Sequence, residues 1–319
     1  MFNPAPPEAK LIGERNRMNR TDFSRRRFAL IAGTLAARIP ARGAGLTAQD
    51  FVKRIQGILG GDWPNDGPDG FKAGDPETPV RGVATTAMAT MEVLKLASKG
   101  GLNMIVTYEP TFFGRQDGPA APNPGGRGRG PAGVSASDPV YTAKKEFIEK
   151  NGMVVWRLRD HWQARKENDL TTGLAESLGW TRYRASGNDA IYDIPASTLE
   201  ETVALIRRKL NLRGGVRAVG DRRARVRRVI LHPGLMAVST MLERFSATDL
   251  IVAGEVREWE CVHYAADINT SGEKRSLVTI GRVASEDPGM RSCANWLKSV
   301  AKEVPVQWIS AGDPYWRAV

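Results

Sequence analysis

The chain has 319 residues, of which 41% are hydrophobic, and 46 Lys and Arg against 35 Asp and Glu leave a net charge of +11. This length suits two ordinary domains or one large one, and the hydrophobic content excludes a chain too polar to form a core. Residues 1–43 hold nine basic and three acidic residues, so they account for +6 of the charge and the remainder for +5. A mildly basic body does not by itself argue for nucleic acid. The two cysteines, Cys261 and Cys293, make no disulfide framework, and one disulfide or two buried thiols both fit.

The amino-terminal segment has the pattern of an export signal. Residues 24–30 read Ser-Arg-Arg-Arg-Phe-Ala-Leu, which fits the twin-arginine pattern, and an apolar stretch covers residues 28–37. That stretch is too short for a membrane span but suits a signal-peptide core, and a disordered basic tail is the alternative. We expect residues 1–43 to be a twin-arginine-type signal peptide, cleaved between residues 36 and 45, and the protein to be periplasmic or extracellular. No other segment is long and apolar enough for a stable membrane span.

A strand–helix–strand unit is predicted over residues 80–113, after a helix at residues 46–58 and a Gly- and Pro-rich loop at residues 60–78. Its first strand is short, at residues 80–84, and its second, at residues 102–107, is apolar enough to be buried. The helix between them has Thr85 or Thr86 as N-cap, Gly100 as its stop, and an apolar face of Ala87, Met91, Leu94 and Ala97.

Strands joined in this way run parallel, and ligands bind beyond the carboxyl ends of such strands. Tyr108, Glu109 and Pro110 stand at that end, so the unit indicates where a site lies. The loop that follows, residues 114–139, is dense in Gly and Pro and is interpreted either as a lid over the site or as a surface insertion.

The rest of the chain alternates between helical and strand patterns. Helices are predicted at residues 140–150, 169–178, 199–210, 235–245, 257–268 and 288–302. Strands are predicted at residues 153–158, 190–194, 216–219, 225–231, 250–253, 276–280 and 304–309. This alternation predicts an α/β protein of two linked lobes of mixed sheets flanked by helices, which we divide into residues 46–195 and 196–319.

Several predicted strands end at charged or hydrogen-bonding side chains. These are Tyr108 and Glu109, Asp160 and His161, Glu255, and Arg282 with Glu286 one turn later. If the strands share a sheet edge, their carboxylates converge and repel one another unless a positive charge lies between them. A divalent transition metal is one solution, and an arginine is the other, for which Arg159 and Arg282 are available. His232 and His263, by contrast, are expected to be structural.

Four segments carry a resemblance to a known family. Residues 80–113 resemble the first signature of the NIF-three-like (NIF3-like) dinuclear metal centre family, and residues 107–110 match its glutamate-variant branch except for Tyr108 at a histidine position. Residues 281–286 resemble the carboxy-terminal signature, with Arg282 in place of a ligand histidine. Residues 159–163 resemble a His-Asp-His-Trp-His segment of that branch, and residues 254–260 are also similar to it. The resemblance runs from about Leu46 to the end of the chain.

The resemblance implies a NIF-three-like fold, a ring-shaped hexamer and a site for Zn, Mn or Fe. The metal ligands that it implies are Glu109, Asp160, His161 and Glu286, with Tyr108, Arg159, Gln163, Glu255 and Arg282 as further site residues. It leads to two hypotheses: a metal-dependent hydrolase of unspecified substrate, and a non-catalytic oligomeric binding or scaffold protein in which Arg159 and Arg282 replace the metals. Nucleic-acid binding through the arginine-rich residues 222–228 is the least supported, because no aromatic side chains are interleaved for stacking.

Overall fold

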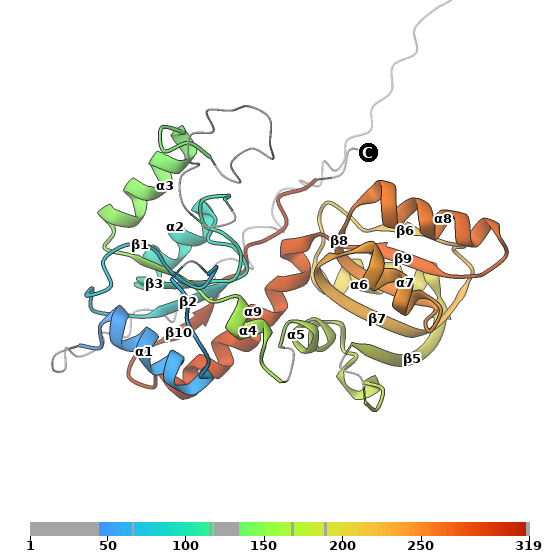
Figure 1. The fold of residues 1–319 in the computed structure, drawn as a ribbon, viewed down its shortest axis with the longest axis horizontal. Coiled ribbons are helices and arrows are strands. Elements are labelled where there is room, and N and C mark those ends of the chain that lie inside the picture. Colours follow the sequence, from blue (N-terminus) through green and yellow to red (C-terminus); the bar gives the residue numbers. More distant parts are fainter. Residues whose placement is uncertain are drawn as a thin grey trace, which may run out of the picture. The chain divides into compact units, whose positions relative to one another are not determined.

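The computed structural model describes residues 45–65, 67–114, 117, 134–166, 169–187 and 190–316. Within these residues the chain forms two five-stranded mixed sheets flanked by helices, which confirms the predicted α/β class (Figure 1). The predicted signal peptide and most of the loop 114–139 lie outside the described residues. No helix in the described part of the chain is long and apolar enough to cross a membrane.

The first sheet has the strand order β1-β4-β3-β2-β10, with β1 antiparallel to β4 and the other neighbours parallel. Its strands are β1 (Gly70–Ala73), β4 (Val154–Arg157), β3 (Met104–Thr107), β2 (Val83–Thr86) and β10 (Val306–Trp308). Side chains alternate between its faces: Val106 and Trp156 pack toward α1 (Ala48–Leu59) and α9 (Arg282–Val300). Ile105 and Val155 pack toward α2 (Met91–Lys99) and α3 (Pro139–Lys150).

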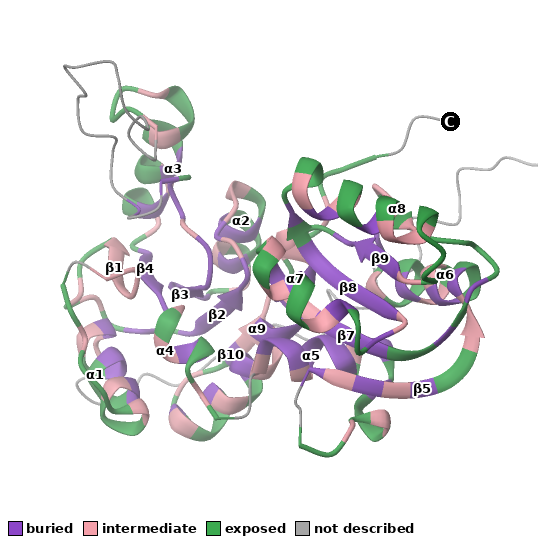
Figure 2. Cartoon of the chain, turned by 45° about the vertical axis from the view of Figure 1, so that its right-hand side comes forward, coloured by how far each residue is buried: buried purple, intermediate pink, exposed green. Residues whose placement is uncertain are grey.

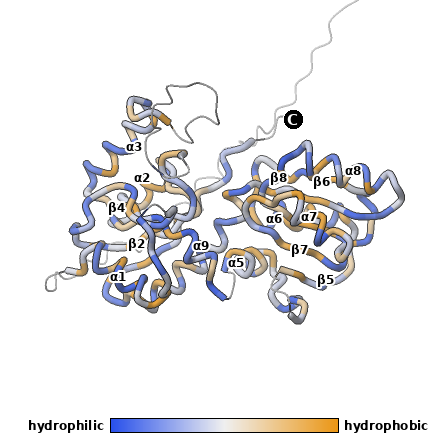
Figure 3. The backbone as a smooth tube through the Cα atoms, viewed as in Figure 1, coloured by the Kyte–Doolittle hydropathy of each residue, from blue (hydrophilic) through white to orange (hydrophobic). Residues whose placement is uncertain are grey.

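The second sheet has the order β5-β7-β8-β9-β6, in which β7, β8 and β9 are parallel. Its strands are β5 (Ile191–Thr198), β7 (Arg225–Met236), β8 (Leu250–Val256), β9 (Ser276–Thr279) and β6 (Arg217–Val219). One face packs on α5 (Asp169–Leu178) and α6 (Leu199–Leu210), the other on α7 (Val238–Phe245) and α8 (His263–Thr270). The central strands β3, β2 and β8 are largely buried (Figure 2), and hydrophobic stretches follow the strands in both sheets (Figure 3).

The strand–helix–strand unit has the predicted order, with β2 and β3 paired in parallel. Its helix begins later than predicted, because Thr85 and Thr86 are wholly buried strand residues. The Thr85 hydroxyl donates to the carbonyl of Met290 in α9 at 2.6 Å, so it is not free to cap a helix. Thr90 is the N-cap instead, its Oγ1 accepting from the Val93 N–H at 3.2 Å, and the helix ends before Gly100 as predicted.

Helix α9 begins at Arg282, six residues earlier than the predicted start at Pro288, which lies inside the helix. The chain turns directly from β9 into α9 at Gly281, whose φ of 94° is in the left-handed region that favours glycine. As a consequence Arg282 and Glu286 lie one turn apart at the start of the helix. The later part of α9, from Met290 to Leu297, packs under the first sheet.

The sheets do not follow the predicted division at residues 195 and 196. That boundary falls inside β5, and the last strand, β10, pairs with β2 in the first sheet. Strand β1 lies within residues 60–78, which were predicted to be a loop. Both cysteines are free and buried, which is one of the two predicted alternatives. Short helices α4 (Asp160–Gln163), η1 (Thr181–Tyr183) and η2 (Glu258–Val262) complete the described elements.

Candidate functional site

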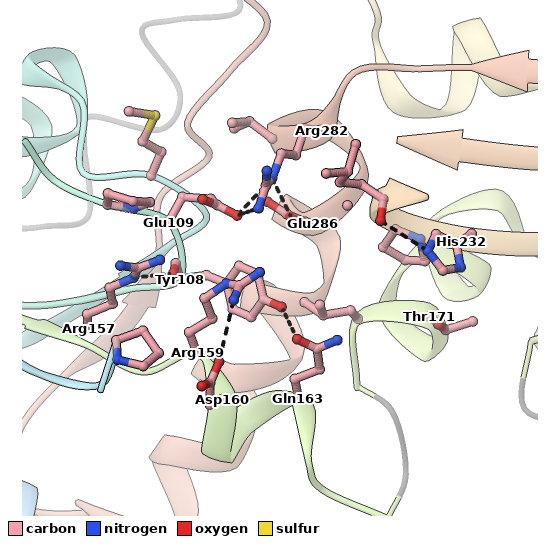
Figure 4. A pocket seen from close by; sticks show the side chains of 18 of the residues that line it. Tyr108, Glu109, Arg157, Arg159, Asp160, Gln163, Thr171, His232, Arg282 and Glu286 are labelled. Carbon is pink, nitrogen blue, oxygen red and sulfur yellow. Dashed lines mark hydrogen bonds and ion pairs between the residues drawn. The ribbon is translucent and has the colours of Figure 1, made fainter. Parts of the chain in front are cut away.

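A cavity of about 1200 Å³ lies where carboxyl ends of strands from both sheets meet. The segment after β3 contributes Tyr108 and Glu109, the segment after β4 contributes Arg159, and the start of α9 contributes Arg282 and Glu286 (Figure 4). The predicted convergence of strand ends therefore occurs, although across two sheets and not along a single sheet edge. The lining also includes Met88, Pro110, Arg157, Asp160, Gln163, His232, Gly234, Leu235 and Arg257.

Arg282 is the centre of an ion-pair cluster. Its Nη2 and Nε lie 2.8 and 3.0 Å from Oε1 of Glu109, and its Nε lies 3.5 Å from Oε1 of Glu286. Its Nη1 lies 3.9 Å from Oε2 of Glu255, whose side chain is 51% exposed. The Glu109 and Glu286 side chains are 9% and 2% exposed, so the guanidinium is the cation that accompanies two buried carboxyl groups.

The protonation of this cluster follows from burial and proximity. Burial, and then the charge of Glu109, raise the pKa of Glu286 well above its ordinary value, against the opposing influence of Arg282. Burial lowers the pKa of Arg282, but Glu109 and Glu286 outweigh it, so its pKa is raised and the guanidinium stays charged. Burial, and then Glu286, raise the pKa of Tyr108, which therefore remains a neutral phenol.

Backbone contacts hold both carboxyl groups in place. The Glu109 N–H donates to the Ala87 carbonyl at 2.7 Å, which fixes the turn after β3. Ser285 Oγ accepts from the Gly234 N–H at 2.9 Å and ties the start of α9 to β7. A Cβ on Gly234 would stand 2.8 Å from Oε1 of Glu286, and one on Gly254 would stand 2.2 Å from Oγ of Ser285. These glycines therefore allow the close approach that buries Glu286.

His161 takes part in a different interaction from the predicted one. Its Nδ1 lies 2.7 Å from Oδ2 of Asp69 and its Nε2 lies 3.0 Å from the carbonyl oxygen of Asp62. Its ring also stacks on Trp63, with centroids 3.5 Å apart and planes 5° from parallel. Asp69 additionally accepts the backbone N–H groups of Arg159, Asp160 and His161 at the start of α4. His161 thus fastens the loop before β1 to the end of β4.

Three more predicted site residues, Arg159, Asp160 and Gln163, follow β4, and Tyr108 contacts two of them. The Tyr108 hydroxyl donates to Oε1 of Gln163 at 3.0 Å. The Arg159 guanidinium lies over the Tyr108 ring, 5.4 Å from its centroid, and its Nη1 is 3.4 Å from Oδ1 of the half-exposed Asp160. Arg157, which was not predicted, donates from Nε to the Tyr108 carbonyl at 3.0 Å.

The structure thus brings Glu109, Glu286, Glu255 and Arg282 together, and it holds Asp160 and His161 in other pairs. Two residues near the site, Asp69 and His232, were not predicted to be site residues from the sequence. Asp69 lies in a segment without helix or strand periodicity, and its partner His161 is 92 residues away, so no local signal marks it. His232 was expected to be structural, yet it lines the cavity, and burial lowers the pKa of its imidazole.

The residues that line this cavity do not fit a metal ion. Arg282 contacts both Glu109 and Glu286, and a guanidinium carries no lone pair for a metal. Both ring nitrogens of His161 already have partners. Across the described residues no group of three or more His, Cys, Asp or Glu side chains is arranged to hold an ion.

Solved structures resemble this chain, whereas no protein-family model and no curated protein sequence match it. The hypothetical protein SA1388 of Staphylococcus aureus aligns with a TM-score of 0.63 at 17% identity, over 86% of this chain and 100% of that chain. A Bacillus cereus protein related to NIF3 aligns with a TM-score of 0.60 at 14% identity, over 88% of this chain and 100% of that one. The chain has the NIF3-like fold.

A third solved structure with the NIF3-like arrangement is reduced HcgD from Methanocaldococcus jannaschii. It aligns with a TM-score of 0.54 at 15% identity, over 83% of this chain and 97% of that chain. The likeness confirms the fold that the sequence resemblance implied. At identities this low the likeness shows the fold and not the chemistry of the site.

Proposed function

We propose that this chain is a NIF3 superfamily protein of the glutamate-variant branch that binds a small molecule in its central cavity without a metal ion. In this proposal Arg282 supplies the positive charge that accompanies the acidic side chains of the cavity. The branch assignment is supported by residues 107–110, which read Thr-Tyr-Glu-Pro. The cavity is large enough for a small molecule, since ligand pockets commonly occupy roughly 300–1000 Å³.

The observation that carries the proposal is the position of Arg282 between Glu109 and Glu286. The two carboxyl groups are 9% and 2% exposed, and the guanidinium lies 2.8 Å from the first and 3.5 Å from the second, so one cation accompanies the negative charge that the pair carries. Arginine is permanently protonated, so it repels a dication and does not ligate one. Tyr108 stands at a position where the resemblance implies a histidine, and it remains a neutral phenol. The site therefore has no imidazole at this position.

Titration with divalent metals tests the proposal. Wild-type protein, purified without a metal-affinity tag, is expected to show no saturable binding of Mn²⁺, Zn²⁺ or Fe²⁺ by calorimetry. The double variant Tyr108→His with Arg282→His restores two imidazoles beside Glu109 and Glu286 and is expected to gain such binding. Tyr108→Phe with Arg282→Met serves as the matched control, since it removes the same groups without adding ligands. Saturable metal binding by the wild type would overturn the proposal.

We further propose that the protein acts as a homo-oligomer, for which the hexamer implied by the sequence resemblance is the specific expectation. The proposed role in this assembly is binding or scaffolding. Such a role requires a shaped cavity and no hydrolytic step. Light scattering coupled to size-exclusion chromatography measures the mass directly. A monomer at micromolar concentration would contradict the assembly, although it would leave the proposed metal-free cavity intact.

Export through the twin-arginine route is also proposed, on the strength of residues 24–30 and the apolar stretch that follows. The protein is then expected in the periplasmic or extracellular fraction of its host. Substituting Arg25→Lys together with Arg26→Lys should retain it inside the cell, because both pattern arginines are lost. Equal export of the double variant would contradict this route.

A further inference from the structure

Arg159 lines the cavity, and the protein engages its guanidinium only in part. Its guanidinium is positioned over the Tyr108 ring, and its contact to Asp160 is long, at 3.4 Å, with the Asp160 side chain 55% exposed (Figure 4). Its Nε is buried and has no hydrogen-bond partner among the described residues. Native structures usually satisfy a buried donor of this kind, so this guanidinium has the capacity for a further acceptor.

The other arginines of the cavity are engaged more fully than Arg159. Arg282 contacts three carboxylates, and Arg157 donates to the Tyr108 carbonyl and lies 3.7 Å from Asp117. Arg257 is 65% exposed and pairs with Glu260 at 3.1 Å. Arg257 keeps free donors too, but at this exposure water satisfies them, whereas the Arg159 side chain is only 28% exposed. Arg159 is therefore the more sheltered guanidinium with donors left for a bound molecule, and its planar fork matches an oxyanion.

A second unpaired atom borders the same space. Oε2 of Glu286 is buried, and it has no hydrogen-bond partner among the described residues, although the side chain is only 2% exposed. Two buried polar atoms, on different residues that both line the cavity, therefore lack hydrogen-bond partners among the described residues.

Apolar side chains line part of the cavity beside the charged and polar ones. Met88, Pro110 and Leu235 border the cavity, and the Leu235 side chain is in part exposed to it. We infer that the cavity binds a small molecule with an apolar body and one oxyanion, a carboxylate or a phosphate, with the oxyanion on Arg159. The apolar body lies along Leu235 and Met88, where it removes apolar surface from water. This inference rests on the proposed metal-free cavity, because a metal there would itself attract an oxyanion.

Calorimetric or NMR titration with simple probes tests the inference. Benzoate and phenyl phosphate each carry one oxyanion on an apolar ring, and benzamide is the neutral control of the same shape. Metal content is measured in the same samples, so that metal uptake, which refutes the proposed function, is distinguished from a failure of anion binding. We expect benzoate or phenyl phosphate to bind and benzamide to bind about tenfold more weakly or not at all.

Substitutions then locate the oxyanion. Arg159→Gln should weaken binding of the preferred anion by about tenfold or more, because it removes a charged donor pair. Arg257→Gln is the matched control: it removes the same charge at the mouth of the cavity and should leave affinity within about twofold. A higher affinity for benzoate or for phenyl phosphate shows whether the site prefers a carboxylate or a phosphate. The inference is overturned if benzamide binds as well as the anions, if no probe binds to metal-free protein, or if both variants have equal effects.

Discussion

Replacing Arg282 by methionine removes the cation of the cluster and leaves its acidic partners in place. Glu109 and Glu286 are then buried at 9% and 2% exposure without their closest counter-charge. Breaking a buried ion pair from one side typically costs 3–5 kcal/mol, whereas exposed pairs cost about 0.2–1 kcal/mol. Because the Arg282 side chain is itself 30% exposed, we expect an intermediate loss of about 2–3 kcal/mol.

Thermal unfolding at neutral pH measures this loss. For a protein of this size about 1 kcal/mol corresponds to roughly 2–4 °C, so Arg282→Met should lower Tm by roughly 4–12 °C. Adding Glu109→Gln should recover part of that loss, because it removes a charge that Arg282→Met leaves unpaired. Arg54→Met is the control: Arg54 pairs with Glu303 at 2.7 Å, but the two side chains are 38% and 44% exposed. It should cost less than about 1 kcal/mol. The reasoning is refuted if the double variant is destabilised by the sum of its single effects.

Three further substitutions test other parts of the site. His161→Ala should lower the free energy of unfolding by about 1–3 kcal/mol and increase proteolysis in the loop before β1, because it removes the side-chain hydrogen bonds to Asp69 and to the Asp62 carbonyl and the stacking on Trp63. The pKa of Glu286 is raised by burial above its ordinary value of 4.5, so this group favours the folded state fully below that pH and loses the contribution as pH rises through its folded pKa. Glu286→Gln should therefore gain stability relative to wild type with rising pH, and a constant difference from pH 4 to 8 would contradict this. Gly254→Ala should lower Tm, because the added Cβ would lie 2.6 Å from the backbone oxygen of Gly234, and an unchanged Tm would show that the strands can separate.

The fold class could be predicted because its signals are local. Alternating helix and strand periods need no knowledge of distant residues, and the order of β2, α2 and β3 emerged from one continuous stretch. The predicted boundaries of helices and strands were wrong where contacts with residues distant in the sequence determine the conformation. Thr85 is a good helix cap by type, but pairing with β3 and a hydrogen bond to Met290 in α9 hold it in a strand.

The site could be predicted in part. The placement of Glu109 and Glu286 near one another followed from strand ends, and Arg282 was recognised as a substitute counter-charge. The assignment of His161 as a metal ligand did not anticipate its pairing with Asp69, because that residue lies 92 positions away in a segment predicted as loop. Which polar side chains use up one another's hydrogen bonds depends on the packed structure and cannot be obtained from sequence patterns.

Elemental analysis of the untagged protein tests the central claim most directly. The protein is loaded with Mn²⁺ or Zn²⁺, dialysed, and its metal content measured per chain. Because the guanidinium of Arg282 already accompanies Glu109 and Glu286, we predict only substoichiometric metal after dialysis. One or more tightly held ions per chain, lost on substitution of Glu109 or Glu286, would contradict the claim that an arginine organises this cavity.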